Sequence, residues 1–360
     1  MTAREYPVFT VTPKAERSLR AGHPWVYGEE VTAVEGAYQN GDMVDVVSNK
    51  GRYLGTGWVN DHSKIRVRII SRNANDTFDE AFFRRRVCYA LNYRKTVMGP
   101  VDYRCCRLIF GEADQFPGLT VDRFENILVT QVLSLGMERR KDWVYRALVE
   151  LLREDGEQID AIYERNDVAI RTLEGLEQGK GFYQMEGLRT DLSGHVTITE
   201  NRIKYDVDYM EGQKTGFFLD QKYNRQAAAK LARGRRVLDC FTHTGAFALN
   251  AAAAGAEHVT AVDVSAFALE LAAENGKRNG LTNLDYKCAD VFDLLTEMAK
   301  EKKCDYDYII LDPPAFTKSR ATAKNAYHGY KEINRKAMQL LPRGGYLATC
   351  SCSHLSLIHI

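Results

Sequence analysis

The chain has 360 residues, of which 45% are hydrophobic, and its 49 Lys and Arg residues nearly balance its 48 Asp and Glu residues. This composition predicts a globular protein of two or three domains, and the net charge of +1 does not by itself indicate a nucleic-acid partner. The first residues form no secretory signal, no apolar run is long enough to span a membrane and the eight cysteines lack paired CxxC motifs; we therefore expect a cytoplasmic protein with reduced thiols, no membrane association and no bound metal.

The first segment, residues 1–73, consists of short β-rich stretches separated by turns. Alternating and β-branched residues predict strands at 8–11, 43–47, 53–59 and 65–70, and a short helix is expected at 14–20. Short strands in a segment of this length predict a small β-barrel-like domain, which is too short to form a catalytic domain of its own.

The second segment, residues 76–190, follows a polar linker near 71–76. Helical periodicity predicts helices at 79–98 and 141–153, and strands are expected at 103–110, 119–133, 161–165 and 167–171. Because these elements lack βαβ spacing, we expect an α+β domain.

The first helix of this second segment is rich in basic residues. Arg84 and Arg85 are candidate contacts to a nucleic-acid backbone, because the sequence places only Asp102 nearby as a counter-charge for a set that also includes Arg86, Arg94, Lys95, Arg104 and Arg107. A solvated helix face explains such a run of charges equally well.

The third segment, residues 195–354, alternates apolar strand-like runs with long helices, which predicts a doubly wound α/β fold with a buried parallel sheet. Its first strand ends at Asp239, and the following turn contains Phe241, Thr244 and Gly245. This turn is not a GxGxxG motif, so it favours a ligand without a pyrophosphate over a dinucleotide. An ordinary tight turn between strand and helix accounts for it equally well.

Acidic residues recur at the ends of the next two strands. Asp263 can accept hydrogen bonds from ribose hydroxyls, and Asp290 is followed by Val291 and by Phe292, which can pack on an adenine ring. One acid in such a position is commonly a helix N-cap. Three acids at successive strand ends together predict a cofactor site.

The fourth and fifth strands end in residues that point to chemistry. Asp312, Pro313 and Pro314 fix an extended turn, and Phe316 can stack on a planar ring; this pattern is typical of methyltransferases that act on planar nitrogen-bearing rings. Cys350 and Cys352 follow the fifth strand. We interpret this pair as a source of a nucleophilic thiol rather than as a metal site, although a buried apolar role is possible for either one.

These motifs resemble, over nearly the whole chain, those of the bacterial cytosine-5 methyltransferases of large-subunit ribosomal RNA that carry an N-terminal PUA domain. The resemblance is carried in order by HPWVYGEEV (23–31), GEADQFPGLTVDRF (111–124), YERNDVAIR (163–171), GQKTGFFLDQ (212–221), VLDCFTHTGAFAL (237–249), LDPPAF (311–316) and TCSCS (349–353). It implies a PUA-like domain, an α+β middle domain and a class I (Rossmann-like) methyltransferase domain that uses S-adenosylmethionine.

The resemblance also implies a mechanism. The family nucleophile lies seven positions after a Gly-Gly pair, which corresponds to Cys352, with Cys350 as the reserve. Its thiolate adds to carbon-6 of cytosine, and Asp312 holds the ring nitrogen or the exocyclic amine. The segment before the first strand would line the methionine end of the cofactor or the target base, through Lys214 as a phosphate contact and through Thr215, Phe218, Asp220 and Gln221.

Two alternatives remain open from the sequence. Amino methylation of a purine would need no nucleophilic cysteine, and an RNA-binding module with an inert catalytic domain would not bind the cofactor. The expected partner is large-subunit ribosomal RNA with a single-stranded or flipped cytosine, and a homodimer stays open. Residues 355–360 (LSLIHI) depart from the family pattern, so we expect a non-native tail after an incomplete methyltransferase domain.

Overall fold

A computed structural model describes residues 5–301, 304–316 and 323–352; the residues of the expected tail, 355–360, lie outside this range. The chain divides into two compact units, which we describe separately. The first comprises Met1–Ile198 with Val207–Leu219, and the second comprises Thr199–Asp206 with Asp220–Ile360.

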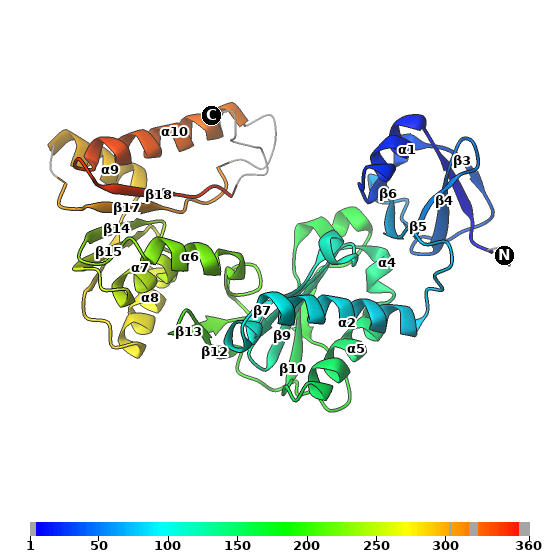
Figure 1. Cartoon of the computed structure of the whole chain (residues 1–360), viewed down its shortest axis with the longest axis horizontal. Helices are drawn as coiled ribbons and strands as arrows, with labels where there is room; N and C mark the ends of the chain where they lie inside the picture. The colour runs from blue at the N-terminus through cyan, green and yellow to red at the C-terminus, as the bar shows by residue number, and fades with distance from the viewer. Residues whose placement is uncertain (1–4, 302–303, 317–322, 353–360) are drawn as a thin grey trace. The chain divides into compact units, whose positions relative to one another are not determined.

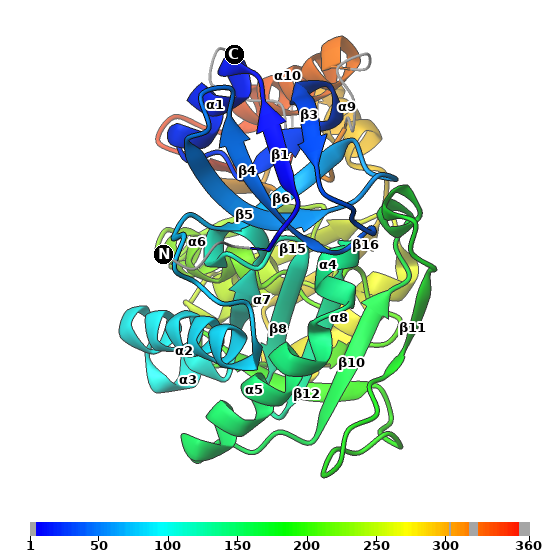
Figure 2. The ribbon, with the colours of Figure 1, turned by 90° about the vertical axis from the view of Figure 1, so that its right-hand side faces the viewer.

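The N-terminal domain of the first unit is a six-stranded sheet curled around its own apolar core (Figure 2). Its strands lie in the order β2-β6-β5-β4-β1-β3, and only the β1–β4 pair among them is parallel. The strands are β1 (Val8–Val11), β2 (Trp25–Tyr27), β3 (Val31–Glu35), β4 (Met43–Ser48), β5 (Tyr53–Val59) and β6 (Ile65–Ser71), with helix α1 at Pro13–Arg20. The four expected strands and the helix are confirmed. The prediction missed β2 and β3 because the first has three residues and most of the second is exposed.

The middle domain of the first unit packs helices against a five-stranded sheet of order β11-β10-β9-β8-β7 (Figure 2). Helices α2 and α5 contact each other and share one core with the sheet. The elements are α2 (Glu80–Val97), α3 (Pro100–Tyr103), β7 (Cys105–Phe110), β8 (Leu119–Phe124), β9 (Ile127–Val132), α4 (Leu135–Glu138), α5 (Lys141–Glu154), β10 (Ala161–Asn166) and β11 (Gly179–Phe182).

Two details of the middle domain correct the sequence prediction. Strand β10 pairs parallel to β9, so β9, α5 and β10 form the βαβ unit that we did not expect. Residues 167–171 are not a strand, since Ala169–Glu174 form a 3-10 helix. This segment turns so that Arg171 is buried and donates hydrogen bonds to the carbonyls of Val132 and Glu177. A continued strand would carry Arg171 away from these two carbonyls.

The second unit contains a fully parallel five-stranded sheet of order β16-β15-β14-β17-β18, as the α/β prediction requires. Helices α9 and α10 lie on one side of this sheet, and α7 and α8 lie on the other (Figure 1). The strands are β14 (Arg236–Cys240), β15 (His258–Asp263), β16 (Leu284–Cys288), β17 (Tyr308–Leu311) and β18 (Tyr346–Thr349). The helices are α6 (Lys222–Ala229), α7 (Ala246–Ala253), α8 (Ala266–Arg278), α9 (Val291–Glu301) and α10 (Ala323–Leu340).

Alternate residues of the central strands face two separate cores, which explains their continuous apolar sequences. In β14, Val237 packs toward α7 and Leu238 packs toward α9 and α10. Strands β14 and β17 are neighbours although two other strands of the sheet, β15 and β16, separate them in the chain, so the strand order reverses between them. In doubly wound folds, ligands bind at the carboxyl ends of the strands beside such a reversal.

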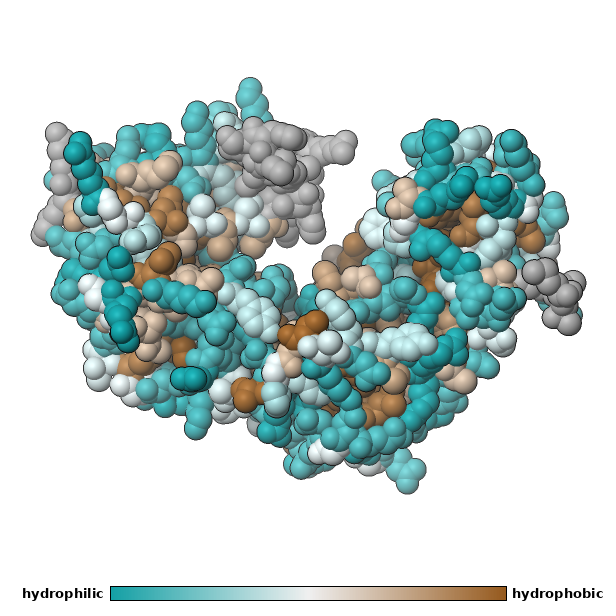
Figure 3. Space-filling model, viewed as in Figure 1, coloured by the Kyte–Doolittle hydropathy of each residue, from teal (hydrophilic) through white to brown (hydrophobic). Residues whose placement is uncertain are grey.

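Strands β12 (His195–Glu200) and β13 (Ile203–Asp208) form an additional two-stranded sheet. Within the ranges that the structure describes, no helix is both long and apolar enough to cross a bilayer. Most of the surface visible in Figure 3 is hydrophilic, and apolar side chains appear there in small groups.

Candidate active site

The register of the parallel sheet brings Asp312 and Cys350 together. Leu311 pairs with Thr349, so the next residue of each strand leaves the sheet at the same level. The backbone amide of Cys350 donates to the carbonyl of Leu311 at 2.8 Å, which holds the two strand ends side by side. Asp312 also lies close to the end of β14, since its backbone amide is 3.4 Å from the carbonyl of Cys240.

A hydrogen-bonded group surrounds the Asp312 carboxylate. The side-chain amide of Gln221 donates to both of its oxygens at 3.3 and 3.4 Å, and Asn224 donates to the Gln221 carbonyl at 2.6 Å. Burial, followed by the charge and hydrogen bonding of Asp312, raises the pKa of Cys350 to about 12, whereas its hydrogen bond with Gln221 acts in the opposite direction. The Cys350 thiol is therefore a poor source of thiolate.

Cys352 lies two residues further along the same strand end. Its side chain is exposed, unlike the half-buried Cys350. It is close enough to Cys350 for the two thiols to affect each other electrostatically. The structure thus presents a half-buried thiol, Cys350, in contact with Asp312, and a more accessible thiol, Cys352, two residues further on. His354, which follows the two cysteines, lies outside the described residues.

Asp239 is a fully buried acid on the central strand β14. One oxygen accepts a hydrogen bond from Thr242 at 2.5 Å, while Oδ1 is buried and makes no hydrogen bond of normal geometry among the described residues. Burial is the main cause that raises the pKa of Asp239 to about 7, and the charges of Asp312 and Asp263 add to it; Thr242 and the backbone amide of Ala248 lower it. The unsatisfied oxygen fits a ligand that brings a hydrogen-bond donor or a positive charge.

The turn after β14 is held by its packing on the following helices. Phe241 and His243 have positive φ angles of 63° and 51°, and Gly245 has a φ of 82°. A Cβ on Gly245 would lie 2.6 Å from the Leu249 side chain and 2.9 Å from that of Ala272, so glycine is required here for close helix packing. The glycine in this turn therefore has a structural explanation that is independent of ligand binding.

Asp263 and Asp290 have different local roles. The Asp263 carboxylate accepts hydrogen bonds from the backbone amides of His243 at 2.8 Å and Ser265 at 2.9 Å, so it connects the two loops that follow β14 and β15. Asp290 caps the start of α9 by accepting from the amides of Phe292 and Asp293. Val291, beside it, is buried.

Replacing Asp263 with alanine should weaken S-adenosylmethionine binding by roughly 1–3 kcal/mol, which is the usual cost of losing a charge-assisted hydrogen bond. The loop tie to His243 is lost in the same variant. Asp263→Asn retains one amide-accepting oxygen and is the matched control for loop structure. Calorimetric titration measures both variants, and unchanged affinity in Asp263→Ala would remove this residue from the cofactor site.

The aromatic residues expected near the cofactor form a continuous group. The ring centroids of Phe241 and Phe292 lie 6.5 Å apart, those of Phe292 and Phe316 lie 5.6 Å apart, and that of Tyr330 lies 4.5 Å from Phe316. The prediction missed Tyr330, whose hydroxyl lies 3.4 Å from the carbonyl of Pro314. Of the two prolines, Pro313 is buried and Pro314 is exposed.

The segment before β14 divides between the two units, so its expected residues are described with the unit to which each belongs. Asp220 is exposed and, with Gln221, belongs to the second unit. Lys214 and Phe218 belong to the first unit, where the Lys214 ammonium lies 4.5 Å from the Phe218 ring centroid. Thr215 is buried and donates to Asp122 at 2.6 Å, which makes it a structural residue of the middle domain.

The basic helix is less positive than the sequence suggests, and the statement that only Asp102 balances it is wrong. Arg84 pairs with Glu150 and Glu154 at 2.6 and 2.7 Å, and Arg85 lies 3.5 Å from Asp76. Four of the other five basic residues also meet acids, in the pairs Arg94–Asp114, Lys95–Asp155, Arg104–Glu125 and Arg107–Asp122, whereas Arg86 donates to the carbonyl of Ile70. Most of these acids are distant in sequence, so the tertiary fold supplies the missing counter-charges.

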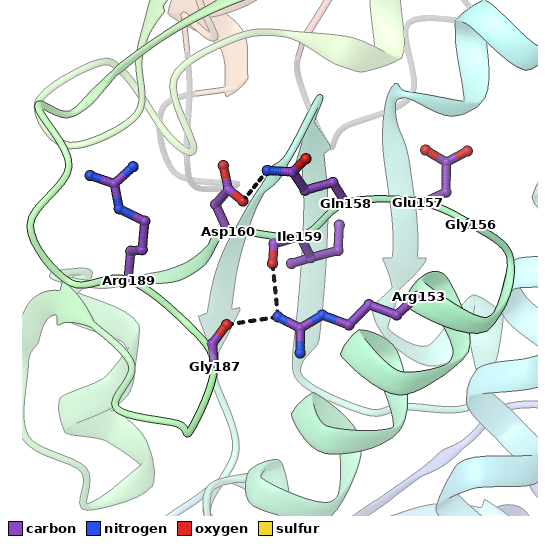
Figure 4. A pocket seen from close by; sticks show the side chains of 8 residues that line it. All are labelled: Arg153, Gly156, Glu157, Gln158, Ile159, Asp160, Gly187 and Arg189. Atoms are coloured by element: carbon purple, nitrogen blue, oxygen red, sulfur yellow. Dashed lines mark hydrogen bonds between the residues drawn. The ribbon is translucent and has the colours of Figure 1, made fainter.

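Two cavities of the first unit are lined by none of the residues at the strand ends of the second unit. One, of about 520 Å³, contains Arg153 at its wall, with hydrogen bonds to the carbonyls of Ile159 and Gly187 (Figure 4). The other, of about 430 Å³, lies beside α2. The carboxyl ends of β14, β17 and β18 form the candidate active site, because acids, thiols and an unsatisfied buried oxygen lie there.

Comparison with known proteins identifies the families to which parts of the chain are similar. Residues 9–72 match the PUA-like domain family, and residues 183–355 match the S-adenosylmethionine-dependent methyltransferase family. The chain is 43% identical over 343 residues to the ribosomal RNA large subunit methyltransferase I of Photobacterium profundum, covering 94% of this chain and 84% of that protein.

Solved structures show the same fold. A SAM-dependent methyltransferase from Streptococcus mutans aligns with a TM-score of 0.77 at 22% identity, covering 97% of this chain and 87% of that one. A methyltransferase complexed with SAH also aligns with a TM-score of 0.77, at 23% identity, covering 95% and 85% of the two chains.

Proposed function

The chain belongs to the ribosomal RNA large subunit methyltransferase I family, and from that membership we propose that it methylates carbon-5 of a cytosine in large-subunit ribosomal RNA. It is an S-adenosylmethionine-dependent methyltransferase with a PUA-like domain. The observation that carries the cytosine assignment is the exposed Cys352 thiol two residues beyond Cys350, which contacts Asp312. Methylation of a purine amine would need no thiol at this place.

The residues at the strand ends suit S-adenosylmethionine. Asp239 would offer its unsatisfied oxygen to a donor on this cationic molecule, Asp263 would accept from its ribose, and Phe292 would pack against its adenine. When bound, S-adenosylmethionine supplies an electrophilic methyl group. With a pKa of about 7, the buried Asp239 carboxyl is only about half ionised at neutral pH, and a positive charge beside it would favour its ionised form.

The protein residues then activate the target ring. The Cys352 thiolate forms a bond to carbon-6 of cytosine, and the electron pair released makes carbon-5 nucleophilic toward the methyl group. After methylation, carbon-5 loses its proton to a base, the electron pair re-forms the ring double bond and the thiolate leaves carbon-6. Asp312, oriented by Gln221, would hold the ring nitrogen or amine and stabilise charge that develops there. The residue after Pro314 is Ala315, so a second thiol from this turn is not available to assist release.

We propose that the target cytosine is flipped or single-stranded, because a thiol cannot reach carbon-6 inside a stacked helix. The PUA-like domain would hold RNA that flanks the target, and the methylation would take place in the cytoplasm, where ribosomes are assembled. A homodimer stays a prediction. Mapping of methylated bases in ribosomal RNA from a deletion strain tests the function. We expect the loss of one 5-methylcytosine, which the gene restores. Loss of a methylated purine instead would show that the protein is an amino methyltransferase.

The affinity for S-adenosylmethionine should rise with pH up to about 7 and then level off. Below its pKa of about 7, Asp239 is protonated and must release its proton when a cationic ligand binds, so affinity should fall by up to about tenfold per pH unit below that point. Calorimetry at several pH values checks this. Asp239→Asn should bind weakly without this dependence, and Thr242→Val, which removes the hydrogen bond that lowers the pKa of Asp239, should move the midpoint upward. A pH dependence retained in Asp239→Asn would contradict the assignment.

A further inference from the structure

We propose that the cavity beside α2 binds one nucleotide of single-stranded RNA that flanks the methylated site. This α2 cavity is the 430 Å³ space lined by Asn73, Asp76, Arg85, Arg86, Tyr89 and Gln115. Its volume falls within the range of small-ligand sites. The proposal rests on the proposed function only in taking RNA as the substrate, since it concerns a different unit from the catalytic residues.

Two exposed tyrosines provide the first argument. Tyr89 lines the cavity and Tyr93 follows it by one helical turn, so both side chains emerge from the same face of α2. Each is 60% exposed, which is unusual for two large aromatic side chains on one face. The guanidinium of Arg94 lies 5.3 Å from the Tyr93 ring centroid and supports that ring from below. Bases stack on such rings in proteins that bind single-stranded nucleic acids.

Two arginines at the cavity provide the second argument. Arg86 donates through one nitrogen to the carbonyl of Ile70, and its buried NH1 has no hydrogen-bond partner among the described residues. Arg85 is half exposed; it lies 3.5 Å from Asp76, and its guanidinium lies 5.4 Å from the Phe82 ring centroid. The exposed part of Arg85 can therefore donate to a phosphate, and the charge of Arg86 adds to the attraction at the cavity wall.

The acids of the cavity are already engaged. Asp76 accepts from Ser71 at 2.6 Å and from Asn73 at 3.2 Å, and Asp114 is held by a bidentate contact with Arg94. Both carboxylates thus have hydrogen-bond donors of their own, and the Asp76 charge also acts on Arg85 and Arg86. Two open aromatic faces next to two arginines match the combination of π-stacking and phosphate contact that a nucleotide requires. Asn73 and Gln115 add polar groups that can meet a base edge.

Binding of a fluorescein-labelled single-stranded RNA 12-mer to the full chain, followed by anisotropy, tests this proposal. Tyr89→Ala should weaken binding by about 5- to 150-fold, the range that loss of one stacked base produces. Arg85→Ala should also reduce the slope of log affinity against log salt by about 0.7. The control is Arg146→Ala, which removes a similarly exposed arginine of α5 that pairs with Glu80 at the start of α2 and does not line the cavity. Thermal melting of each variant shows that the fold is retained.

A second measurement keeps the result independent of the catalytic unit. RNA containing 4-thiouridine should crosslink to peptides of α2, and Tyr89→Ala should raise KM for ribosomal RNA while kcat and S-adenosylmethionine affinity stay unchanged. Unchanged RNA affinity in both variants, or no RNA binding by the wild type, would overturn the proposal. If RNA binds at α2 but no 5-methylcytosine forms, the proposed function fails and the cavity assignment stands. If 5-methylcytosine forms but both variants bind RNA as tightly as the wild type, only the cavity assignment fails.

Discussion

Cys352→Ala should reduce methyl transfer by on the order of 10⁴-fold or more, while S-adenosylmethionine affinity changes less than about twofold. The reason is chemical, because carbon-5 of cytosine is a weak nucleophile until a group has added to carbon-6. Cys352 is exposed at the strand end and is not one of the residues that would hold the cofactor, so its removal should spare cofactor binding. Transfer of a tritiated methyl group to ribosomal RNA and calorimetric titration measure the two quantities.

Cys350→Ala is the matched control and should be much milder. Burial and the neighbouring Asp312 raise the pKa of Cys350 to about 12, so only roughly one molecule in 10⁵ would carry a thiolate there at pH 7. The same thiol is hydrogen-bonded to Asp312 and Gln221, which makes it a positioning group for the carboxylate. A modest loss of kcat without loss of the covalent intermediate is expected.

The covalent step can be observed directly with RNA that contains 5-fluorocytosine. Fluorine cannot leave carbon-5 as a proton does, so elimination of the thiolate is blocked and the protein should stay attached to RNA on a denaturing gel. Cys352→Ala should give no adduct, whereas Cys350→Ala should retain it. The reverse pattern would exchange the two assignments, and no adduct with either cysteine present would favour amine methylation.

The sequence predicted the architecture best where local patterns and tertiary structure agree. The parallel sheet of the second unit was predictable because β14, β15 and β17 are buried on both faces and hence continuously apolar. Residues 167–171 show the opposite case. Their alternating pattern resembles a strand, but Arg171 is turned inward by the carbonyl of Val132, which lies 39 residues earlier in the chain.

The candidate site shows the same division. The sequence placed Asp312 and the cysteine pair at the ends of the fourth and fifth strands, and the pairing of β17 with β18 brings Asp312 beside Cys350, since the carboxyl ends of parallel strands share one edge. The roles of Gln221 and Asn224 as supports of Asp312 could not be predicted, because α6 lies about 90 residues before β17 in the chain. The neutralisation of Arg84 by Glu150 was hidden in the same way, with 66 residues between the partners.

Asp312→Asn should lower kcat by about 10²–10³-fold, the usual effect of removing one preorganised group that stabilises developing charge. The substitution keeps the size of the side chain, so it opens no cavity, and the side chain of Gln221 can still form a rearranged contact at this position. Because the Asp312 charge contributes to the raised pKa values of Asp239 and Cys350, both should fall in this variant. The midpoint of the pH dependence of S-adenosylmethionine binding should therefore shift to lower pH.

This second effect separates the direct role of Asp312 from a merely structural one. A variant that only disturbs the turn would lower kcat without a defined shift of the midpoint, whereas loss of the charge predicts a shift and faster alkylation of Cys350. Gln221→Leu is the matched control, since it leaves the Asp312 charge in place but removes the two donors that orient it. It should reduce kcat less than Asp312→Asn does and should not lower the pKa of Asp239. An Asp312→Asn variant with full kcat would show that another group holds the target ring, and the acid would then serve only to set the charge balance at the ends of β14 and β17.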